Sequence, residues 1–302
     1  MKLKNAIICQ EVVFMKKTLV IGSSVCDVII NIHHMPKTTG DENIISQHFS
    51  IGGCAYNVAS MLRYYQLPYT LFSPIGTGIY GDFVKQTFMS KKIPISIETK
   101  QKNGCCYCFV DHLGERTFIC EHGAEYFYQK EWFDKLDVSQ YSQVYICGLE
   151  IEETTGDIII DFLEKHPQLH VYFAPGPRIL SIDSKKMQRI FKLHPTLHLN
   201  EQEILSYTKE KDLSQGADKL YQQTKQTIIV TLGAKGCYVY DGQQEYFIDG
   251  YPTQVVDTIG AGDSHIGTFI AQQMMGVSLQ ESLKQANQIA SQVVGISGAT
   301  LK

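Results

Sequence analysis

Residues 257–263 read DTIGAGD and lead directly into a stretch that is compatible with a helix. Glycines allow backbone N–H groups to turn toward a ligand, and the positive end of a following helix favours negative charge at the same place. Such a loop is suited to binding an anion. A carboxylate beside a bound phosphate would be repelled unless it had a proton to collect. We therefore expect Asp263 to act as a general base next to a phosphoryl group.

A second segment with binding potential is residues 51–59, which read IGGCAYNVA. Gly53 would let the backbone approach the hydroxyls of a ligand, and the amide of Asn57 can both donate and accept hydrogen bonds. Asp27, just after the first expected strand, could hold two adjacent hydroxyls with its two carboxylate oxygens. A simple helix-entry turn is the alternative interpretation of Gly53 and Asn57.

These two segments resemble the two signatures of the ribokinase-like (PfkB) family of sugar and nucleoside kinases, and the resemblance extends from Thr18 almost to the C-terminus. It implies an ATP-dependent kinase that phosphorylates a hydroxymethyl group of a small sugar, with Asp263 as the general base. The backbone N–H groups expected to stabilise the transferring phosphoryl group belong to Gly260, Ala261 and Gly262. The residues expected to hold the sugar are Asp27, Gly53 and Asn57.

The class of acceptor stays open at this point. A nucleoside is the alternative to a sugar, because Tyr56, Tyr107 and Phe109 could supply a stacking face for a base. An NAD-binding oxidoreductase is a remote alternative, suggested by the G-x-G-x-x-G of residues 76–81. That fingerprint needs an acidic residue about 20 positions later, where residues 100–102 read KQK. A catalytically silent sugar-binding regulator is disfavoured because residues 257–263, called the anion loop from here on, are intact.

The resemblance also implies a nucleotide site at residues 231–236 (TLGAKG), which follow an expected strand. The ends of such strands are where an open α/β sheet presents its ligands. The residues expected at the nucleotide are Thr231, Gly233, Gly236 and Asn287, the last on the final helix, where the family packs adenine. The family usually has Phe where this chain has His265, and we expect that ring to fill a half-buried slot rather than touch substrate.

Two cations are implied. Asn200 and Glu203 are similar to the N-x-x-E element that orders water around Mg²⁺, although the same pair can also cap a helix. Potassium would brace the anion loop through Asp257, the carbonyl of Ile259 and a later loop at residues 295–298, and so preorganise the N–H groups opposite. The alternative is that Asp257 only caps its own turn.

Other clusters of metal-binding residue types are less convincing. In the group formed by Cys105, Cys106, Cys108, Cys120 and His122, the C-x-x-C pair is Cys105 and Cys108, which would face opposite sides of a strand, so we do not expect zinc. His194 and His198 are four residues apart, but the proline between them makes a regular helix improbable. We expect these histidines in a loop or at the edge of a strand.

Short apolar runs alternate with helical stretches along the chain, which predicts an α/β fold with a mostly parallel sheet covered on both faces. Strands are expected at residues 18–22, 69–74, 144–147, 170–174, 196–199, 227–231 and 237–240. The resemblance implies a ribokinase-like three-layer sandwich. Residues 28–50 and 95–120 read as extended pieces and would form a small β-sheet lid that excludes water from the sugar site, the alternative being an edge hairpin.

We expect a single kinase domain over residues 15–302, with residues 1–14 as an extension or a misplaced start. The net charge of −4 gives no reason to expect nucleic acid or an acidic membrane as a partner. No apolar run approaches the roughly 20 residues that span a bilayer. The nine cysteines without a secretory signal suggest a cytoplasmic protein with reduced thiols. We also expect a homodimer that forms through the lid.

Overall fold

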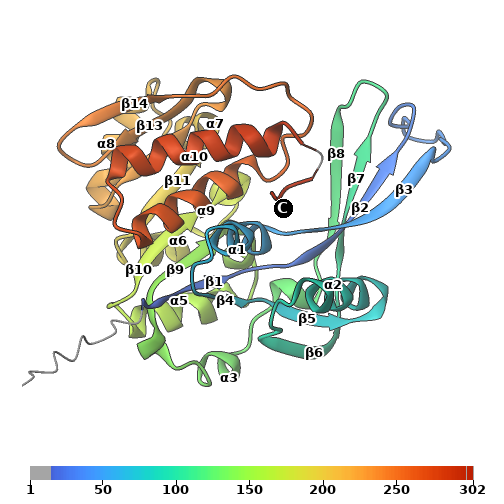
Figure 1. Cartoon of the computed structure of the whole chain (residues 1–302), viewed down its shortest axis with the longest axis horizontal. Helices are drawn as coiled ribbons and strands as arrows, with labels where there is room; N and C mark the ends of the chain where they lie inside the picture. Colours follow the sequence, from blue (N-terminus) through green and yellow to red (C-terminus); the bar gives the residue numbers. More distant parts are fainter. Residues whose placement is uncertain (1–14, 297, 302) are drawn as a thin grey trace, which may run out of the picture.

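The central element of the structure, a computed structural model that describes residues 15–296 and 298–301, is an eight-stranded sheet (Figure 1). Its strand order is β14-β13-β12-β11-β10-β9-β1-β4. The strands from β4 to β12 are parallel, whereas β13 and β14 run antiparallel at one edge. The strands are β1 (Lys17–Ile21), β4 (Tyr69–Phe72), β9 (Tyr141–Cys147), β10 (His170–Ala174), β11 (Thr196–Asn200), β12 (Ile228–Thr231), β13 (Gly236–Tyr240) and β14 (Glu245–Asp249).

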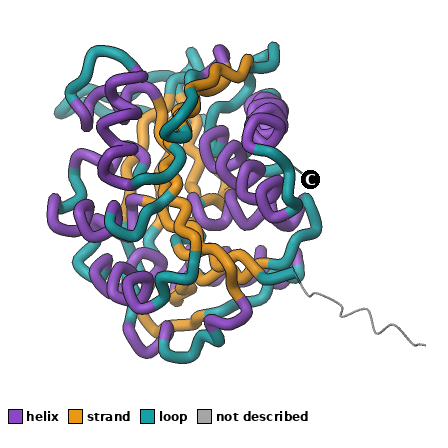
Figure 2. The backbone as a smooth tube through the Cα atoms, turned by 90° about the vertical axis from the view of Figure 1, so that its left-hand side faces the viewer, coloured by secondary structure: helices purple, strands orange, loops and turns teal. Residues whose placement is uncertain are grey.

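Helices cover both faces of this sheet, as Figure 2 shows. Successive residues of a strand point to opposite faces, so Leu19 and Ile21 join one apolar core while Val20 joins the other. One face is covered by α1 (Cys54–Tyr64), α9 (Ala261–Met274) and α10 (Leu279–Val294). The other is covered by α5 (Gly156–Lys165), α6 (Ser184–Phe191), α7 (Glu201–Thr208) and α8 (Leu213–Thr224). The predicted mostly parallel, three-layer arrangement is confirmed.

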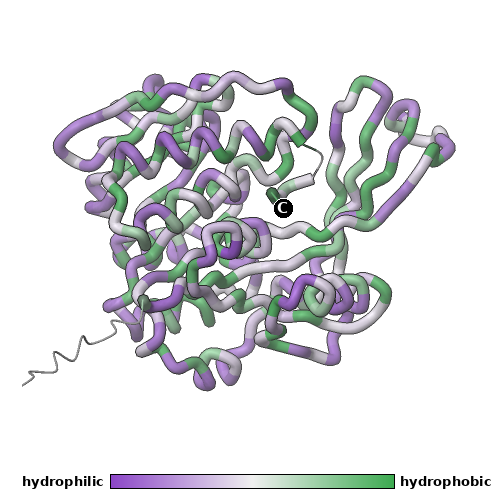
Figure 3. Tube along the Cα trace, in the orientation of Figure 1, coloured by the Kyte–Doolittle hydropathy of each residue, from purple (hydrophilic) through white to green (hydrophobic). Residues whose placement is uncertain are grey.

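Hydropathy explains how α10 is oriented. Hydrophobic and hydrophilic residues are interspersed along α10 (Figure 3), and its buried positions include Leu283, Ala286 and Ile289. This spacing of three residues places one apolar stripe against the sheet and leaves the opposite side to solvent. In the part of the chain that the structure describes, no helix is long and apolar enough to cross a membrane.

A second, four-stranded sheet forms the lid beside the central sheet (Figure 1). Its order is β3-β2-β7-β8, from β2 (Val25–Asn31), β3 (Ser46–Gly52), β7 (Cys105–Val110) and β8 (Arg116–Glu121). The small lid predicted from the sequence is therefore present. Residues 97–102, which the sequence assigned to it, instead form β6 (Ile97–Lys102) and pair with β5 (Pro74–Thr77) in a separate two-stranded sheet. Helix α2 (Gly78–Lys91) follows β5.

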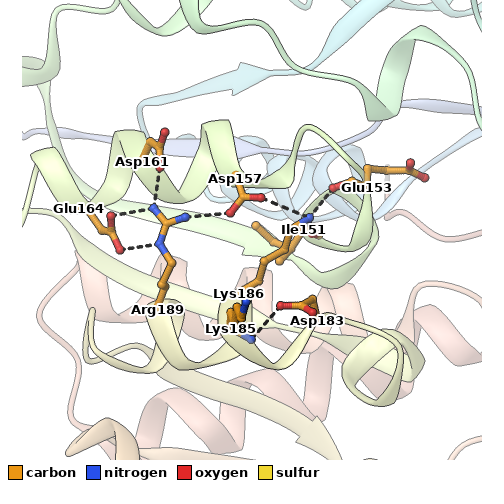
Figure 4. A network of polar contacts seen from close by, with 9 residues as sticks. All are labelled: Ile151, Glu153, Asp157, Asp161, Glu164, Asp183, Lys185, Lys186 and Arg189. Atoms are coloured by element: carbon orange, nitrogen blue, oxygen red, sulfur yellow. Dashed lines mark hydrogen bonds and ion pairs between the residues drawn. The ribbon is translucent and has the colours of Figure 1, made fainter.

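A network of ion pairs joins α5 and α6 (Figure 4). Arg189 reaches Asp157 at 2.8 Å and Glu164 at 2.7 Å. Lys186, one turn earlier, donates to the backbone oxygens of Ile151 at 3.0 Å and Glu153 at 2.6 Å. These two carbonyls end the short helix α4 (Gly148–Glu152), so the lysine satisfies backbone acceptors that a helix terminus leaves open.

The sequence expectations differ from the structure in two further places. Strand β14 was not predicted. His198, expected in a loop or at a strand edge, lies in β11 near the middle of the central sheet and is only 5% exposed. His194, by contrast, lies in a loop, where its ring nitrogen Nδ1 is 2.8 Å from the backbone oxygen of Thr224. The expectation for residues 1–14 lies outside the described residues.

Candidate active site

The anion loop folds as its glycines predict. Gly260 has φ of 74°, in the left-handed region, and is the N-cap of α9. A Cβ there would lie 2.5 Å from the Cβ of Ala299, so the position needs glycine for space as well as for conformation. Gly262 has open space around it. The N–H of Ala261 makes only a long hydrogen bond of 3.3 Å to the carbonyl of Thr258. The start of α9 is thus open to an anion.

Asp263, in the first turn of α9, contacts the other signature segment. Its Oδ2 accepts a hydrogen bond of 2.8 Å from Nδ2 of Asn57, which lies on α1, 206 residues away. Burial raises the pKa of Asp263, while hydrogen bonds from Asn57 and Cys54 oppose that rise. The Oδ1 of Asn57 is buried and has no hydrogen-bond partner among the described residues. A buried acceptor without a donor is costly, so this oxygen is suited to a ligand hydroxyl.

Asp27 lies on lid strand β2, and the first glycine of the GG pair packs directly against its carboxylate. A Cβ on Gly52 would come within 2.0 Å of Oδ2 of Asp27. Gly53 has φ of 98°, and a Cβ there would lie 2.4 Å from the carbonyl oxygen of Ser23. Burial, followed by the charges of Cys120 and Asp263, raises the pKa of Asp27 to about 7. The structure therefore brings Asp27 and Asp263 near enough for their charges to interact.

A cavity of about 180 Å³ lies between the inner face of the lid and the anion loop. Asp27 and Asp257 line it, whereas Gly53, Asn57 and Asp263 do not. Sequence reasoning missed several polar residues that line this cavity, namely Asn31, His48, Ser50 and Arg116. The alternation of side chains along the lid strands was the only signal for them, because it fixes which residues share a face with Asp27.

Glu150 is another residue that the sequence did not single out. Its side chain is 1% exposed, and Oε1 accepts a hydrogen bond of 2.7 Å from the N–H of Ser23. Burial raises the pKa of Glu150, and hydrogen bonds from Cys147 and Ser23 oppose that rise. The side-chain oxygens of Ser23 and Ser24 are buried without a hydrogen-bond partner among the described residues. Glu150 follows the end of strand β9, which is the edge where parallel sheets place ligands.

A larger cavity of about 510 Å³ lies on the other side of the anion loop. The predicted nucleotide residues all line it: Thr231, Gly233, Gly236 and Asn287. The loop glycine Gly262 lines it as well, so one cavity connects the anion loop with the expected adenine side. Apolar wall residues that the sequence did not predict are Tyr251, Pro252, Val255 and Val294.

Asn287 and His265 belong to one buried chain of hydrogen bonds beneath this cavity. Nε2 of His265 is 3.1 Å from Oδ1 of Asn287, and its Nδ1 is 2.9 Å from Nε2 of His198. The Nδ2 of Asn287 donates to the backbone oxygens of Ile248 and Asp249 at 3.0 and 3.1 Å. Burial lowers the pKa of His265 to about 4, so the ring is neutral near pH 7. The amide of Asn287 is thus engaged by the protein.

Asn200 and Glu203 form a complete capping box at the start of α7. The N–H of Glu203 donates to Oδ1 of Asn200 at 2.8 Å, and Oε2 of Glu203 accepts from the N–H of Asn200 at 2.9 Å. Neither residue lines the larger cavity of about 510 Å³, but Asn200 pairs with Thr231 across β11 and β12. Burial raises the pKa of Glu203, partly opposed by the Asn200 N–H. The pair lies at the same end of the sheet as the nucleotide residues.

Asp257 is held by three groups. Its carboxylate contacts the guanidinium of Arg116 and accepts N–H bonds from Ile259 at 2.7 Å and from Gly298 at 3.2 Å. Burial alone would raise the pKa of Asp257, but the hydrogen bonds from Arg116, Ile259 and Gly298 lower it. The later loop was expected here and does approach through Gly298, although residue 297 lies outside the described residues.

The rival interpretations find little geometric support. Strand β5, which precedes α2, is not part of the central sheet, and a Cβ on Gly76 or Gly81 would meet backbone atoms within 2.6 Å. Packing thus accounts for Gly76 and Gly81, and a φ of 85° accounts for Gly78, the middle glycine of the G-x-G-x-x-G. Across the described residues, no three His, Cys, Asp or Glu side chains are grouped so as to hold a metal ion.

Comparison with known proteins agrees with this arrangement. A family model described as "pfkB family carbohydrate kinase" matches residues 15–302. An "uncharacterized sugar kinase YegV" of Escherichia coli strain K12 is 31% identical over 294 residues, which cover 95% of this chain and 91% of that protein. A ribokinase of Mus musculus is 27% identical over 298 residues, covering 93% of this chain and 89% of that protein.

Solved structures share the fold at lower identity. A ribokinase from Thermotoga maritima superposes with a TM-score of 0.82 at 22% identity, covering 94% of both chains. A ribokinase from Cryptococcus neoformans var. grubii in complex with ADP gives 0.75 at 22%, covering 94% of this chain and 95% of that chain. A Burkholderia thailandensis nucleoside kinase in complex with inosine gives 0.77 at 15%, covering 93% and 92%. With the family model spanning nearly the whole chain and both signature segments meeting at Asp263, this protein belongs to the pfkB family of carbohydrate kinases.

Proposed function

We propose that this kinase transfers the γ-phosphoryl group of ATP to a hydroxymethyl group of a small sugar, with Asp263 as the general base. The hydrogen bond between Asn57 and Asp263 carries the proposal, because it joins the expected sugar-binding segment to the anion loop. The unpartnered, buried Oδ1 of Asn57 gives the same place a free acceptor for a hydroxyl.

The reaction needs four contributions from the chain. Asp263 takes the proton as the sugar oxygen forms its bond to phosphorus and the bond to the ADP oxygen breaks. Its raised pKa makes it a better proton acceptor than an ordinary aspartate. The N–H groups of Gly260, Ala261 and Gly262 stabilise charge on the phosphoryl group, and the lid excludes water as a competing acceptor. Asp27, Gly53 and Asn57 hold the sugar.

The positions of Tyr56, Tyr107 and Phe109, the three side chains that could stack on a base, favour a sugar over a nucleoside. Tyr56 is 2% exposed and stacks on Phe88 in the core. Tyr107 hydrogen-bonds to Tyr80 on α2 at 2.8 Å, so it is turned away from the cavity lined by Cys108, its neighbour on β7. Phe109 lies on the same face of β7 as Tyr107. None of the three is placed to stack on a base in the cavity beneath the lid.

Mg²⁺ would bind with the phosphates near Glu203, whose half-buried carboxylate suits a hard cation reached through water. When bound, the ion neutralises part of the phosphate charge. The expected potassium site at Asp257 stays a prediction, and the Arg116 guanidinium already contacts that carboxylate. Any monovalent cation would therefore have to bind beside Arg116 or after it moves.

A thermal-shift screen tests the proposal directly. The panel is D-ribose, 2-deoxy-D-ribose, D-fructose, inosine and adenosine, each with and without ATP and Mg²⁺, with NAD and NADP as controls. We expect one sugar to raise the melting temperature further when nucleotide is present, and NAD to have no effect. Stabilisation by nucleosides alone would favour the nucleoside alternative, and stabilisation by NAD would contradict a kinase.

The remaining expectations concern location and assembly. A cytoplasmic location and a homodimer formed through the lid are compatible with the proposed function. Ile44, Ile45 and Ile119 are exposed hydrophobic residues of the lid region, which is where a second subunit would cover apolar surface. Size-exclusion chromatography with light scattering would measure the assembly state.

A further inference from the structure

Two cysteines face each other across the hairpin of the lid. Cys106 on β7 and Cys120 on β8 are directly opposite in antiparallel register, and their sulfur atoms are 3.4 Å apart. Opposite residues of an antiparallel pair have Cα atoms about 4.5–5.5 Å apart, and disulfides form across Cα separations of about 4.4–6.8 Å. A bridge between these sulfurs therefore needs side-chain rotation but no shift of the strands.

The pair lies on the inner face of the lid. Asp27 on β2 is in register with Cys106, so Asp27, Cys106 and Cys120 are neighbours across three adjacent strands. Side chains two residues apart on a strand share a face, and Cys108 and Arg116, which share the face of these thiols, line the cavity beneath the lid. The thiols thus lie beside the carboxylate expected to hold the sugar.

Cys120 has the environment of a reactive thiol. It is exposed, whereas Cys106 is partly buried. A hydrogen bond with Cys106 lowers the pKa of Cys120 to about 6 against the opposing effect of partial burial, and the electrostatic effect of the nearby Arg178 guanidinium adds to the lowering. By contrast, burial raises the pKa of Cys26 to about 12. Thiolates, not thiols, attack disulfides, so Cys120 is the attacking sulfur and Cys106 the one that resolves.

We propose that Cys106 and Cys120 form an oxidisable dithiol on the sugar side of the lid that reacts with low-molecular-weight disulfides such as glutathione disulfide. Cys120 attacks one sulfur of glutathione disulfide, forming a mixed disulfide and releasing one glutathione thiolate. Cys106 then loses its proton and attacks the sulfur of Cys120, releasing the second glutathione. The two cysteines are oxidised to a disulfide, and one glutathione disulfide is reduced to two glutathione molecules.

The bridge would act on the sugar site through its position. It ties β7 to β8 between Asp27, in register with Cys106, and Arg116, four residues before Cys120 on the same strand. A fixed hairpin restricts how the lid can close over the sugar. A small displacement of a bound reactant is enough to lower the reaction rate. This effect on turnover rests on the proposed sugar kinase function, whereas formation of the disulfide does not.

The first experiment measures the chemistry without any substrate. The full chain is incubated with glutathione disulfide at pH 7.5, and its intact mass and free thiols are followed by non-reducing mass spectrometry and iodoacetamide labelling. We expect one internal disulfide joining Cys106 and Cys120 in tryptic maps. Cys106→Ser should stop at the mixed disulfide on Cys120, and Cys120→Ser should form neither product. Cys105→Ala, which removes a thiol from the opposite face of β7, should behave as the unmodified protein does.

The second experiment measures turnover of the panel sugar that gives the largest thermal shift. We expect roughly tenfold lower kcat/KM for that sugar in the bridged protein, full recovery with dithiothreitol, and the same rate before and after oxidation in Cys120→Ser. Failure to form the disulfide, or formation of a bridge to another cysteine, would overturn the dithiol. A fully bridged protein with unchanged kcat/KM would overturn its role at the sugar site. Absence of kinase activity would instead count against the proposed function, and the result of the first experiment on disulfide formation would remain valid.

Discussion

Arg116, on the last strand of the lid, contacts the carboxylate of Asp257, the first residue of the anion loop. The two residues are 141 positions apart in the chain. The same carboxylate accepts N–H bonds from Ile259 within the loop and from Gly298 near the C-terminus. The lid, the anion loop and the C-terminal segment therefore meet at one acidic side chain, whose charge is balanced by a residue of the lid.

Potassium should activate the enzyme more than sodium does at equal ionic strength, because an ion at Asp257 would fix the loop carbonyls and preorganise the N–H groups opposite. The response should be larger in Arg116→Ala, since that variant leaves the Asp257 carboxylate without its cationic partner. Asp257→Asn should abolish it. Initial rates in potassium, sodium and tetramethylammonium chloride test this prediction. Equal rates in all three salts, for the protein without substitutions and for Arg116→Ala, would contradict it.

Asp263→Asn should lower kcat by a factor on the order of hundreds to thousands, because the amide keeps the shape of the carboxylate but cannot take a proton. Sugar and ATP should still bind, which isothermal titration calorimetry can measure on the same sample. Asp249→Asn, a change at the end of the edge strand β14, is the matched control and should keep normal turnover. A variant at position 263 that retained most of its kcat would remove Asp263 from its assigned role.

The raised pKa of Asp27 predicts a pH dependence of sugar binding. Its carboxylate must be ionised to accept two hydroxyls, so kcat/KM for the sugar should fall as the pH drops below about 7. Asp27→Asn should bind sugar weakly and lose that acidic limb. If kcat/KM of Asp27→Asn still falls in the same way below about pH 7, the group that titrates is not Asp27.

The same pKa shift also makes a prediction about stability. The folded protein holds this proton more tightly than the unfolded chain, whose aspartate pKa is about 3.9. The contribution to stability is therefore fully present below that value and is lost as the pH rises through about 7. Urea unfolding at pH 5.5 and 8.5 should show a larger loss of stability with rising pH in the unmodified protein than in Asp27→Asn.

Arg189→Ala should lower the free energy of unfolding by about 0.5–1.5 kcal/mol without changing kcat. The arginine contacts three acidic side chains of α5 with about a quarter to a third of its own side chain exposed, so solvent screening limits its value. Its network joins α5 and α6 (Figure 4), which cover the face of the sheet opposite to the one that α9 covers. Urea titrations and kcat on the same preparation measure both effects, and a large loss of kcat would reveal an unexpected link to the site.

Much of the fold follows from local sequence. The strand at residues 196–199 and the helix start at Asn200 were predictable because apolar periodicity and the capping pair of Asn200 and Glu203 are short-range signals. Strand β14 was missed because its sequence EYFID lies at a half-exposed edge and is held by pairing with β13. The assignment of residues 97–102 to the lid failed for a related reason: an extended stretch does not specify which partner strand it will join.

The site divides in the same way. The sequence by itself determined where the anion loop lies, which glycines it needs and that Asp263 stands at the start of the helix that follows. These features depend only on neighbouring residues, as φ at Gly260 and the start of α9 do. Only the tertiary structure decided that Asn57 contacts Asp263, that His265 is buried between His198 and Asn287, and that Arg116 and the Cys106–Cys120 pair lie on the inner face of the lid. Those contacts join residues far apart in the chain, and they are fixed by strand register and packing rather than by any preference of the local backbone.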